Sequence, residues 1–192
     1  PLSDTLAVRA NALVRRGNTQ VELAEDNRTF GALALGWTPL PGTSLTLRGS
    51  YTRDRSQRPT GFLPYEGFVT PLPDGRRIPI DLFVSDPSVD RYDRDQYEVG
   101  YTLEANLSDK VRFVSNGRYA EIDLIYAGLF GQFAGNPVIE GDSVFITRGN
   151  SRQDASLDNV TIDNHLDGRF ATGAVEHTLL GGVDYAWSET AS

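Results

Sequence analysis

Side chains able to perform acid–base, nucleophilic or metal chemistry are few and scattered in this sequence. It contains no cysteine and two histidines, His165 and His177. The alternation described below places these histidines on strand faces of opposite kind, so neither a shared metal nor a catalytic pair is expected. Serine, histidine and aspartate all occur, but no Gly-x-Ser-x-Gly sequence presents a nucleophile. We therefore expect a protein that is not an enzyme and has no catalytic residue, metal site or cofactor of its own.

An acidic segment at 86–95 resembles a calcium-binding loop only loosely. It has neither the ligand spacing nor the central glycine of an EF-hand. We expect its carboxylates to form ion pairs with Arg91 and Arg94. The aspartates concerned are Asp86, Asp90, Asp93 and Asp95.

Binding chemistry is concentrated in the stretch 61–83. Five of the ten prolines lie in or beside it, which fixes backbone torsions and removes amide donors that a sheet would need. It also holds aromatic side chains that a solvated connector has no physical reason to carry: Phe62, Tyr65, Phe68 and Phe83. A second long connection, 126–155, is equally rich in aromatics: Tyr126, Phe130, Phe133 and Phe145. We expect the stretch 61–83 to be an ordered recognition loop, in which Arg76 and Arg77 beside Asp74 form a solvated turn.

The two long loops are expected to be carried by β-strands, in which apolar and polar residues alternate with a period of two. Apolar and polar residues alternate over seven segments, which predicts strands with one wet face: 6–14, 30–38, 45–54, 96–107, 111–125, 159–170 and 176–188. The alternation weakens between Ala120 and Ile125, which indicates a β-bulge there.

Short and long connections alternate strictly between these strands. Outer-membrane barrels put short turns on one rim and long loops on the other, whereas sandwiches mix them at both ends. Charged residues such as Glu98, Arg118 and Asp163 on the second face would be costly in a packed core but not in a water-filled lumen. The sequence therefore predicts an all-β segment of about seven antiparallel strands from a transmembrane outer-membrane barrel. The alternative is a soluble or surface β-sandwich that serves in binding or adhesion without transport.

The net charge, the apolar runs and the first residue of the sequence bear on its possible partners and on where it belongs in a longer chain. A formal charge of −8 leaves no basic footprint for nucleic acid. No apolar run approaches the roughly 18 residues that a spanning helix needs. Because the sequence begins at Pro1 without methionine, we expect it to be a piece of a longer chain, with any targeting segment upstream.

Four stretches carry a resemblance to a known family: 62–79 (FLPYEGFVTPLPDGRRIP), 91–101 (RYDRDQYEVGY), 163–167 (DNHLD) and 170–185 with its FATG and HTLLGGVDY runs. Together they resemble TonB-dependent siderophore receptors, with ferric hydroxamate (ferrichrome-type) receptors as the most similar branch. The resemblance implies that residues 1–192 are part of a 22-stranded outer-membrane barrel, while the plug domain and TonB box precede residue 1. It also implies a ferric siderophore as ligand, TonB as energy-supplying partner and outer-membrane lipid around the barrel.

The same resemblance implies the ligand site. Family aromatics that line the siderophore pocket fall on Phe62 and Tyr126, whereas two further family tyrosines fall on Thr60 and Gly128, which are not aromatic. Four other aromatics are weaker candidates for ligand contact and are expected mainly to pack the loops: Tyr65, Phe68, Phe83 and Phe130. A siderophore supplies its own iron ligands, so the protein needs only a concave surface of aromatic and hydrogen-bonding groups.

Overall fold

One long, curved antiparallel sheet makes up most of the chain in the computed structural model, which describes residues 2–57, 63–131 and 137–192. Its seven strands are hydrogen-bonded in the order β1-β2-β3-β4-β5-β8-β9. They are β1 (Leu6–Arg15), β2 (Asp26–Leu40), β3 (Thr43–Ser56), β4 (Arg91–Ser108), β5 (Val111–Gly131), β8 (Arg148–Thr172) and β9 (Val175–Ala191). Three small elements lie in the long loops: α1 (Tyr65–Phe68) and the hairpin β6 (Val138–Glu140) with β7 (Ser143–Phe145).

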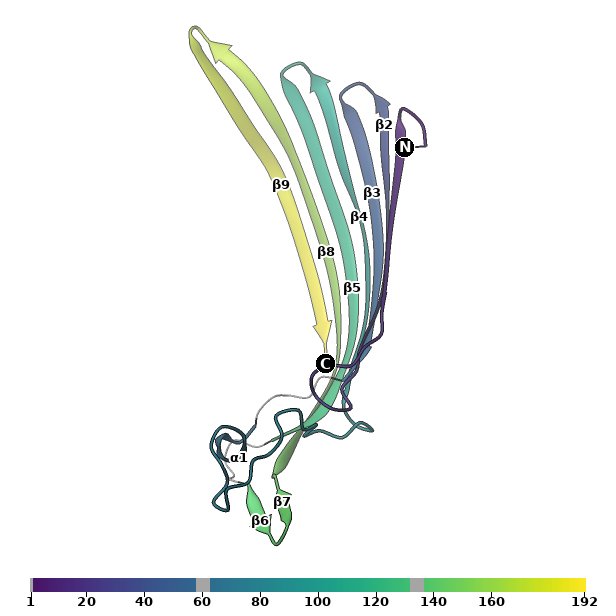
Figure 1. Cartoon of the computed structure of the whole chain (residues 1–192). Coiled ribbons are helices and arrows are strands. Elements are labelled where there is room, and N and C mark those ends of the chain that lie inside the picture. Colours follow the sequence, from purple (N-terminus) through teal and green to yellow (C-terminus); the bar gives the residue numbers. More distant parts are fainter. Residues whose placement is uncertain (1, 58–62, 132–136) are drawn as a thin grey trace.

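Short turns and long loops gather at opposite ends of the sheet, as the sequence predicts (Figure 1). Each short turn joins two directly paired strands: Leu40 faces Thr43, Ser108 faces Val111 and Thr172 faces Val175. At the other end lie α1 and the β6–β7 hairpin. The sheet thus holds all of its long loops at one rim.

The two faces of the sheet differ in chemistry because the side-chain period is two. One face carries large apolar groups that remain exposed, including Leu33 and Val99, each 56% exposed, and Val183 at 74%. The other carries charged pairs, including Arg118 with Glu98 (2.9 Å) and Arg112 with Glu104 (2.8 Å). Within the described ranges no second large sheet covers the apolar face, so the sandwich alternative is wrong.

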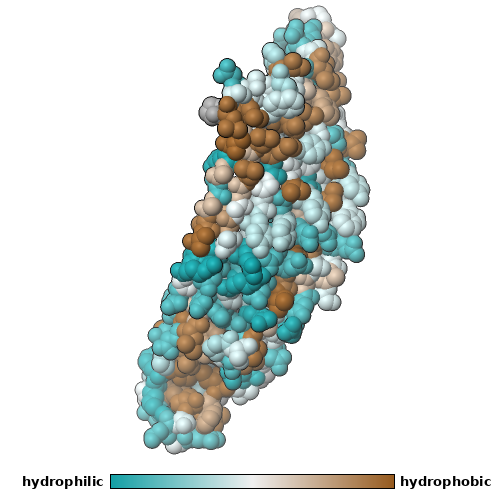
Figure 2. Space-filling model, turned by 90° about the vertical axis from the view of Figure 1, so that its right-hand side faces the viewer, coloured by the Kyte–Doolittle hydropathy of each residue, from teal (hydrophilic) through white to brown (hydrophobic). Residues whose placement is uncertain are grey.

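The apolar face ends in a charged band toward the loop end. Figure 2, which views the convex side, shows apolar groups gathered in the half near the short turns and a hydrophilic band beyond them. At the boundary Tyr51 donates a hydrogen bond to Asp95 (2.5 Å) and Tyr119 donates one to Asp158 (2.6 Å). Tyrosines with an apolar ring and a hydrated hydroxyl are typical of a membrane interface.

Two expectations about the strands are corrected by the structure. Pairing of β5 with both neighbours runs without a register shift from Arg112 to Ala127, so there is no bulge between Ala120 and Ile125. Strand β5 also continues to Gly131, which places Tyr126 and Phe130 on a strand rather than in a loop. Between Ala120 and Ile125 the pattern changes because the apolar residues move to the other face: Ala120, Ile122 and Leu124 share the concave face, whereas Glu121 and Asp123 lie on the convex face.

No helix among the described residues has the length and apolar character needed to cross a membrane.

Candidate functional site

The candidate site lies on the polar face of the sheet, where β4 and β5 reach the loop end. Tyr92 of β4 and Tyr126 of β5 are directly opposite each other in the ladder, and both are half-buried. Phe130 follows four residues after Tyr126 on the same face and is also half-buried. The site therefore combines aromatic side chains from two strands at the mouth of the sheet.

Tyr92 is a site residue that the sequence reasoning missed, because it stands within the charged run that precedes β4. The signal was present in the alternation. Tyr92 shares its parity with Gln96 and Glu98 on the polar face, whereas Tyr97 has the opposite parity and stacks on Tyr51 (4.8 Å between ring centroids). Counting in steps of two from Glu98 would have placed Tyr92 beside Tyr126.

Gly128 lies beneath the segment 83–90, which we call the strap. A Cβ atom added to Gly128 would lie 2.8 Å from Asp90 Oδ2 and 3.6 Å from Ser85 Oγ. The strap therefore covers the strand at Gly128, one of the two positions where the sequence lacks the aromatic residue that the resemblance implies.

Hydrogen bonds fix the strap to β5 and β8. The backbone amide of Leu129 donates to Ser85 Oγ (2.9 Å). Arg148, at the start of β8, donates from Nη1 to the carbonyl oxygens of Val84 and Ser85, both at 3.1 Å. The strap is thus part of the wall of the site, and its first residues, Phe83 and Val84, are buried at 8% and 7% exposure.

Asp86 closes a turn within the strap. The hydroxyl of Ser88 (2.6 Å) and its backbone amide (2.9 Å) donate to the Asp86 carboxylate and, with nearby Arg148, lower the pKa of Asp86. In the part of the chain that the structure describes, no group of three or more histidine and carboxylate side chains could hold a metal ion.

The expected ion pairs of the acidic segment form only in part. Arg91 lies 3.8 Å from Asp93, as expected. Arg94 instead pairs with Asp54 on β3, at 2.9 Å, because its side chain is on the polar face while Asp93 and Asp95 are on the other. Arg55 provides their partner there, bonding Asp95 and lying 3.9 Å from Asp93.

The first long loop has a small core of its own. Leu72 and Ile78 are buried beside Gly67, which has a positive φ of 94°. A Cβ atom on Gly67 would lie 2.7 Å from Ile78 Cδ1, so the tight approach needs glycine. The loop is ordered by packing, as the sequence predicts.

Arg76 ties this loop to the other long connection. It binds Asp74 through Nε (2.6 Å), and its other nitrogens donate to the carbonyl oxygens of Asp142 (2.6 Å) and Gly141 (3.3 Å) in the turn of the β6–β7 hairpin. The Arg76 amide and guanidinium lower the pKa of Asp74. Arg77 donates to the carbonyl of Val69 (3.0 Å). Residues 73–75 form an exposed turn, as expected, and both arginines in addition have backbone partners.

The remaining predicted site residues have different surroundings. Phe62, first among them, lies outside the described residues, as does Thr60. Tyr65 is 67% exposed, Phe68 is half-buried and Phe83 is buried in the strap. The structure therefore places Tyr126 opposite Tyr92, places Phe130 two rows farther toward the loops on the same face, and leaves Tyr65 facing solvent.

No family model matches the chain. The chain is 30% identical over 191 residues to a ferrichrome outer membrane transporter/phage receptor of Escherichia coli, covering 92% of this chain and 25% of that protein. It is 29% identical over 194 residues to a ferrioxamine B receptor of Salmonella typhimurium, covering 96% and 26%. The chain thus spans about a quarter of the length of these relatives.

Solved structures show the same fold. The open form of the ferric-catecholate import receptor Fiu of Escherichia coli superimposes with a TM-score of 0.84 at 17% identity, covering 98% of this chain and 30% of that one. FpvAI, in its complex with pyocin S2, superimposes with a TM-score of 0.76 at 15% identity, covering 99% and 24%. The fold is that of a barrel segment of outer-membrane receptors.

The chain is a homologue of the siderophore receptors of the outer membrane, matching one part of them. This confirms the resemblance inferred from the sequence motifs. The relatives are named as transporters and receptors, in agreement with the expectation that the chain is not an enzyme.

Proposed function

We propose that this chain forms part of the barrel wall of an outer-membrane receptor that binds ferric siderophores, of the hydroxamate type, at its extracellular face and imports them. The observation that carries the proposal is the pair Tyr92 and Tyr126, held opposite each other on the polar face at the loop end. Aromatic rings with hydroxyl groups suit a ligand whose surface is apolar carbon interrupted by oxygen atoms. The names of the ferrichrome and ferrioxamine B relatives support the hydroxamate class.

The proposal extends to the domains, the partner protein and the lipid surroundings of the whole receptor. Residues 1–192 belong to the barrel domain, a plug domain encoded upstream fills the lumen, and TonB supplies energy through a segment of that plug. Lipid covers the convex apolar face, where Leu33 and Val99 are exposed. Iron enters wrapped by the oxygens of the siderophore, so the protein itself provides no iron ligand and no cofactor.

Ligand titration of the full-length receptor in detergent tests the ligand class. A ferric trihydroxamate is expected to bind at least about tenfold more tightly than the same siderophore without iron, and more tightly than a ferric tris-catecholate. Equal affinity for the iron-loaded and iron-free hydroxamate would overturn the proposal. In cells, removal of TonB should abolish uptake of radioactive iron while surface binding of the ferric siderophore persists.

A further inference from the structure

Directly inside the tyrosine pair, on the same face, lies a cluster of two arginines around one aspartate. Arg28 on β2, Asp54 on β3 and Arg94 on β4 are opposite each other in one continuous row of the ladder. The next row toward the loops contains Tyr92 and Tyr126. Side chains two residues apart on a strand share a face, so the cluster and the tyrosines border the same space.

Both arginines bind Asp54 through two nitrogens. Arg28 donates from Nε to Oδ1 (2.6 Å) and from Nη2 to Oδ2 (3.2 Å). The Nε of Arg94 lies 3.0 Å from Oδ2 and its Nη2 lies 2.9 Å from the same oxygen. The carboxylate is therefore saturated by donors and holds the two guanidinium groups in fixed orientations.

The charges of this cluster do not cancel. One carboxylate neutralises one guanidinium, and the neighbouring carboxylate on this face, Asp26, is bound by Arg15 at 2.7 Å. These residues together carry three positive and two negative charges. The Asp54 side chain is only 3% exposed, whereas those of Arg28 and Arg94 are 32% and 25% exposed. Within the Arg28–Asp54–Arg94 cluster the positive charge is thus presented to the concave side and the Asp54 carboxylate is hidden beneath it, whereas the neighbouring Arg15–Asp26 pair is exposed at both ends, at 47% and 41%.

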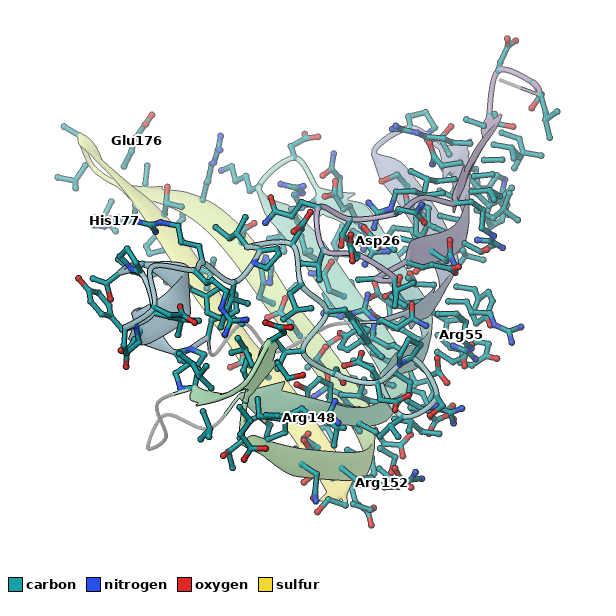
Figure 3. All side chains as sticks on the ribbon, turned by 60° about the horizontal axis from the view of Figure 1, so that its bottom comes forward. Asp26, Arg55, Arg148, Arg152, Glu176 and His177 are labelled. Carbon is teal, nitrogen blue, oxygen red and sulfur yellow. The ribbon has the colours of Figure 1, made fainter. Side chains whose placement is uncertain are left out.

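The alternation of side chains along the strands places the cluster on the concave face of the sheet. Figure 3, viewed from the loop end, shows Asp26 and Arg55 on opposite sides of it. The convex side at this level has its own arginine–aspartate pairs, formed by Arg53 and Arg55 with Asp95, so the concave cluster is not needed to neutralise them. A pair of arginines fixed by a buried carboxylate and facing the ligand space is suited to bind carboxylate oxygen.

We propose that Arg28 and Arg94 contact the bound ligand and select ferric hydroxamates that carry a carboxylate over those that carry an ammonium group. This inference rests on the proposed function and adds a charge preference to it. The two guanidinium groups attract a peripheral carboxylate, and the same excess charge repels an ammonium group at this position.

The test uses the full-length receptor and one linear ferric trihydroxamate in three forms. Its terminal amine is left free, acetylated or succinylated, which gives a positive, neutral or negative ligand around an identical iron centre. We expect the succinylated form to bind about tenfold more tightly than the free amine, with the acetylated form between them. In Arg94→Gln and in Arg28→Gln this ratio should fall to about two, while the affinity for the acetylated form changes less than threefold.

Asp54→Asn should change the charge preference in the opposite direction to the arginine variants. It raises the net charge of the cluster by one, so the preference for the succinylated form must increase if the ligand senses that charge. Arg53→Gln, on the convex face of the same strand, is the matched control and should leave all three affinities unchanged. Folding of each variant is verified by the heat-dependent electrophoretic mobility of the barrel.

The outcomes separate this inference from the proposed function. If the wild-type receptor binds all three forms equally, the charge preference is wrong while the siderophore assignment stands. If all three affinities fall in parallel in the arginine variants and in Asp54→Asn, the cluster has a structural role only and the inference is overturned. If the receptor binds none of the three forms, the proposed function itself fails.

Discussion

Tyr92 and Tyr126 face each other across the ladder of β4 and β5, on the polar side of the sheet and one row outside the arginine–aspartate cluster. Neither residue belongs to a loop in the structure, because both strands continue past the apolar band. The proposed ligand face is consequently built on a hydrogen-bonded scaffold, which holds side chains in more defined positions than a loop does.

Truncation of this pair should weaken ligand binding. Tyr92→Ala and Tyr126→Ala are each expected to reduce the affinity for a ferric trihydroxamate up to about tenfold, since an aromatic contact contributes about 0.5–1.5 kcal/mol beyond its area. Combining Tyr126→Ala with Phe62→Ala should reduce it further. Titration monitored by fluorescence quenching gives the dissociation constants. Tyr97→Ala, on the convex face, is the control; if it weakens binding as much as Tyr126→Ala does, the site is misplaced.

A side chain at Gly128 should displace the strap. In Gly128→Ala the new methyl group would lie 2.8 Å from Asp90 Oδ2, so the strap must shift outward. We expect faster proteolytic cleavage within 83–90 and a local loss of about 1–3 kcal/mol, typical of overpacking. Gly181→Ala is the control, because a Cβ atom there meets nothing within 4 Å. Equal cleavage rates in the two variants would contradict the contact.

Removal of the Arg76 side chain should release the β6–β7 hairpin. Arg76→Ala loses the bonds to Asp142 and Gly141, and hydrogen exchange of amides 138–145 is expected to accelerate. Because these bonds are partly exposed, the effect should be no more than about 1 kcal/mol. Arg77→Ala breaks a bond within its own loop and should leave exchange in the hairpin at the wild-type rate. Unchanged exchange in Arg76→Ala would show that the two loops are not coupled.

The strap should loosen in acid. The pKa of Asp86 is lowered in the folded protein by Ser88 and Arg148, so its contribution is present above the unfolded value of about 3.9 and is lost as the pH falls through the lower folded pKa. The amide proton shift of Ser88, measured by NMR on selectively labelled protein, should titrate below that unfolded value. Asp86→Asn should remove the titration. A midpoint at or above the ordinary aspartate pKa would contradict the hydrogen-bonded turn.

A charge on the convex face should destabilise the barrel far more than one on the concave face. Val99→Lys places an ammonium group in the lipid-facing band, at a cost of about 2–4 kcal/mol near the midplane. Ser50→Lys lies on the concave face opposite Glu98 and should be close to neutral. Unfolding of the full-length receptor in detergent and denaturant compares the two. A larger loss in Ser50→Lys than in Val99→Lys would mean that the two faces have been assigned the wrong way round, and equal losses would mean that neither face lies against lipid.

Sequence reasoning recovered the strands where one face is apolar. The alternation around Val99 and Leu103 predicted β4 and its faces correctly. Strand β8 was expected only over 159–170, but it runs from Arg148 to Thr172. The early part of β8 lies beyond the apolar band and is mainly polar on both faces. It therefore shows no alternation of apolar residues from which its pairing with β5 could be predicted. The same effect concealed Tyr92, whereas the bulge wrongly expected near Ala120 arose because the apolar residues Ala120, Ile122 and Leu124 lie on the concave face.

Contacts between segments distant in the sequence could not be predicted from the spacing of residues. Nothing in the spacing of Arg76 indicates that it reaches Gly141 and Asp142, and the position of the strap over Gly128 depends on the path of the backbone. Composition did indicate that both loops are ordered, because their aromatic and proline content has no use in a solvated connector.

The bridge from Arg76 to the β6–β7 turn bears on how such receptors can be re-engineered. Two loops that emerge from different hairpins share one set of polar contacts, so a loop transplanted alone from a related receptor would arrive without its counterpart. Chimeras that exchange 63–83 and 137–147 together should retain their shape, whereas single exchanges should not. The unit of modular exchange at this rim is therefore a pair of loops and not one.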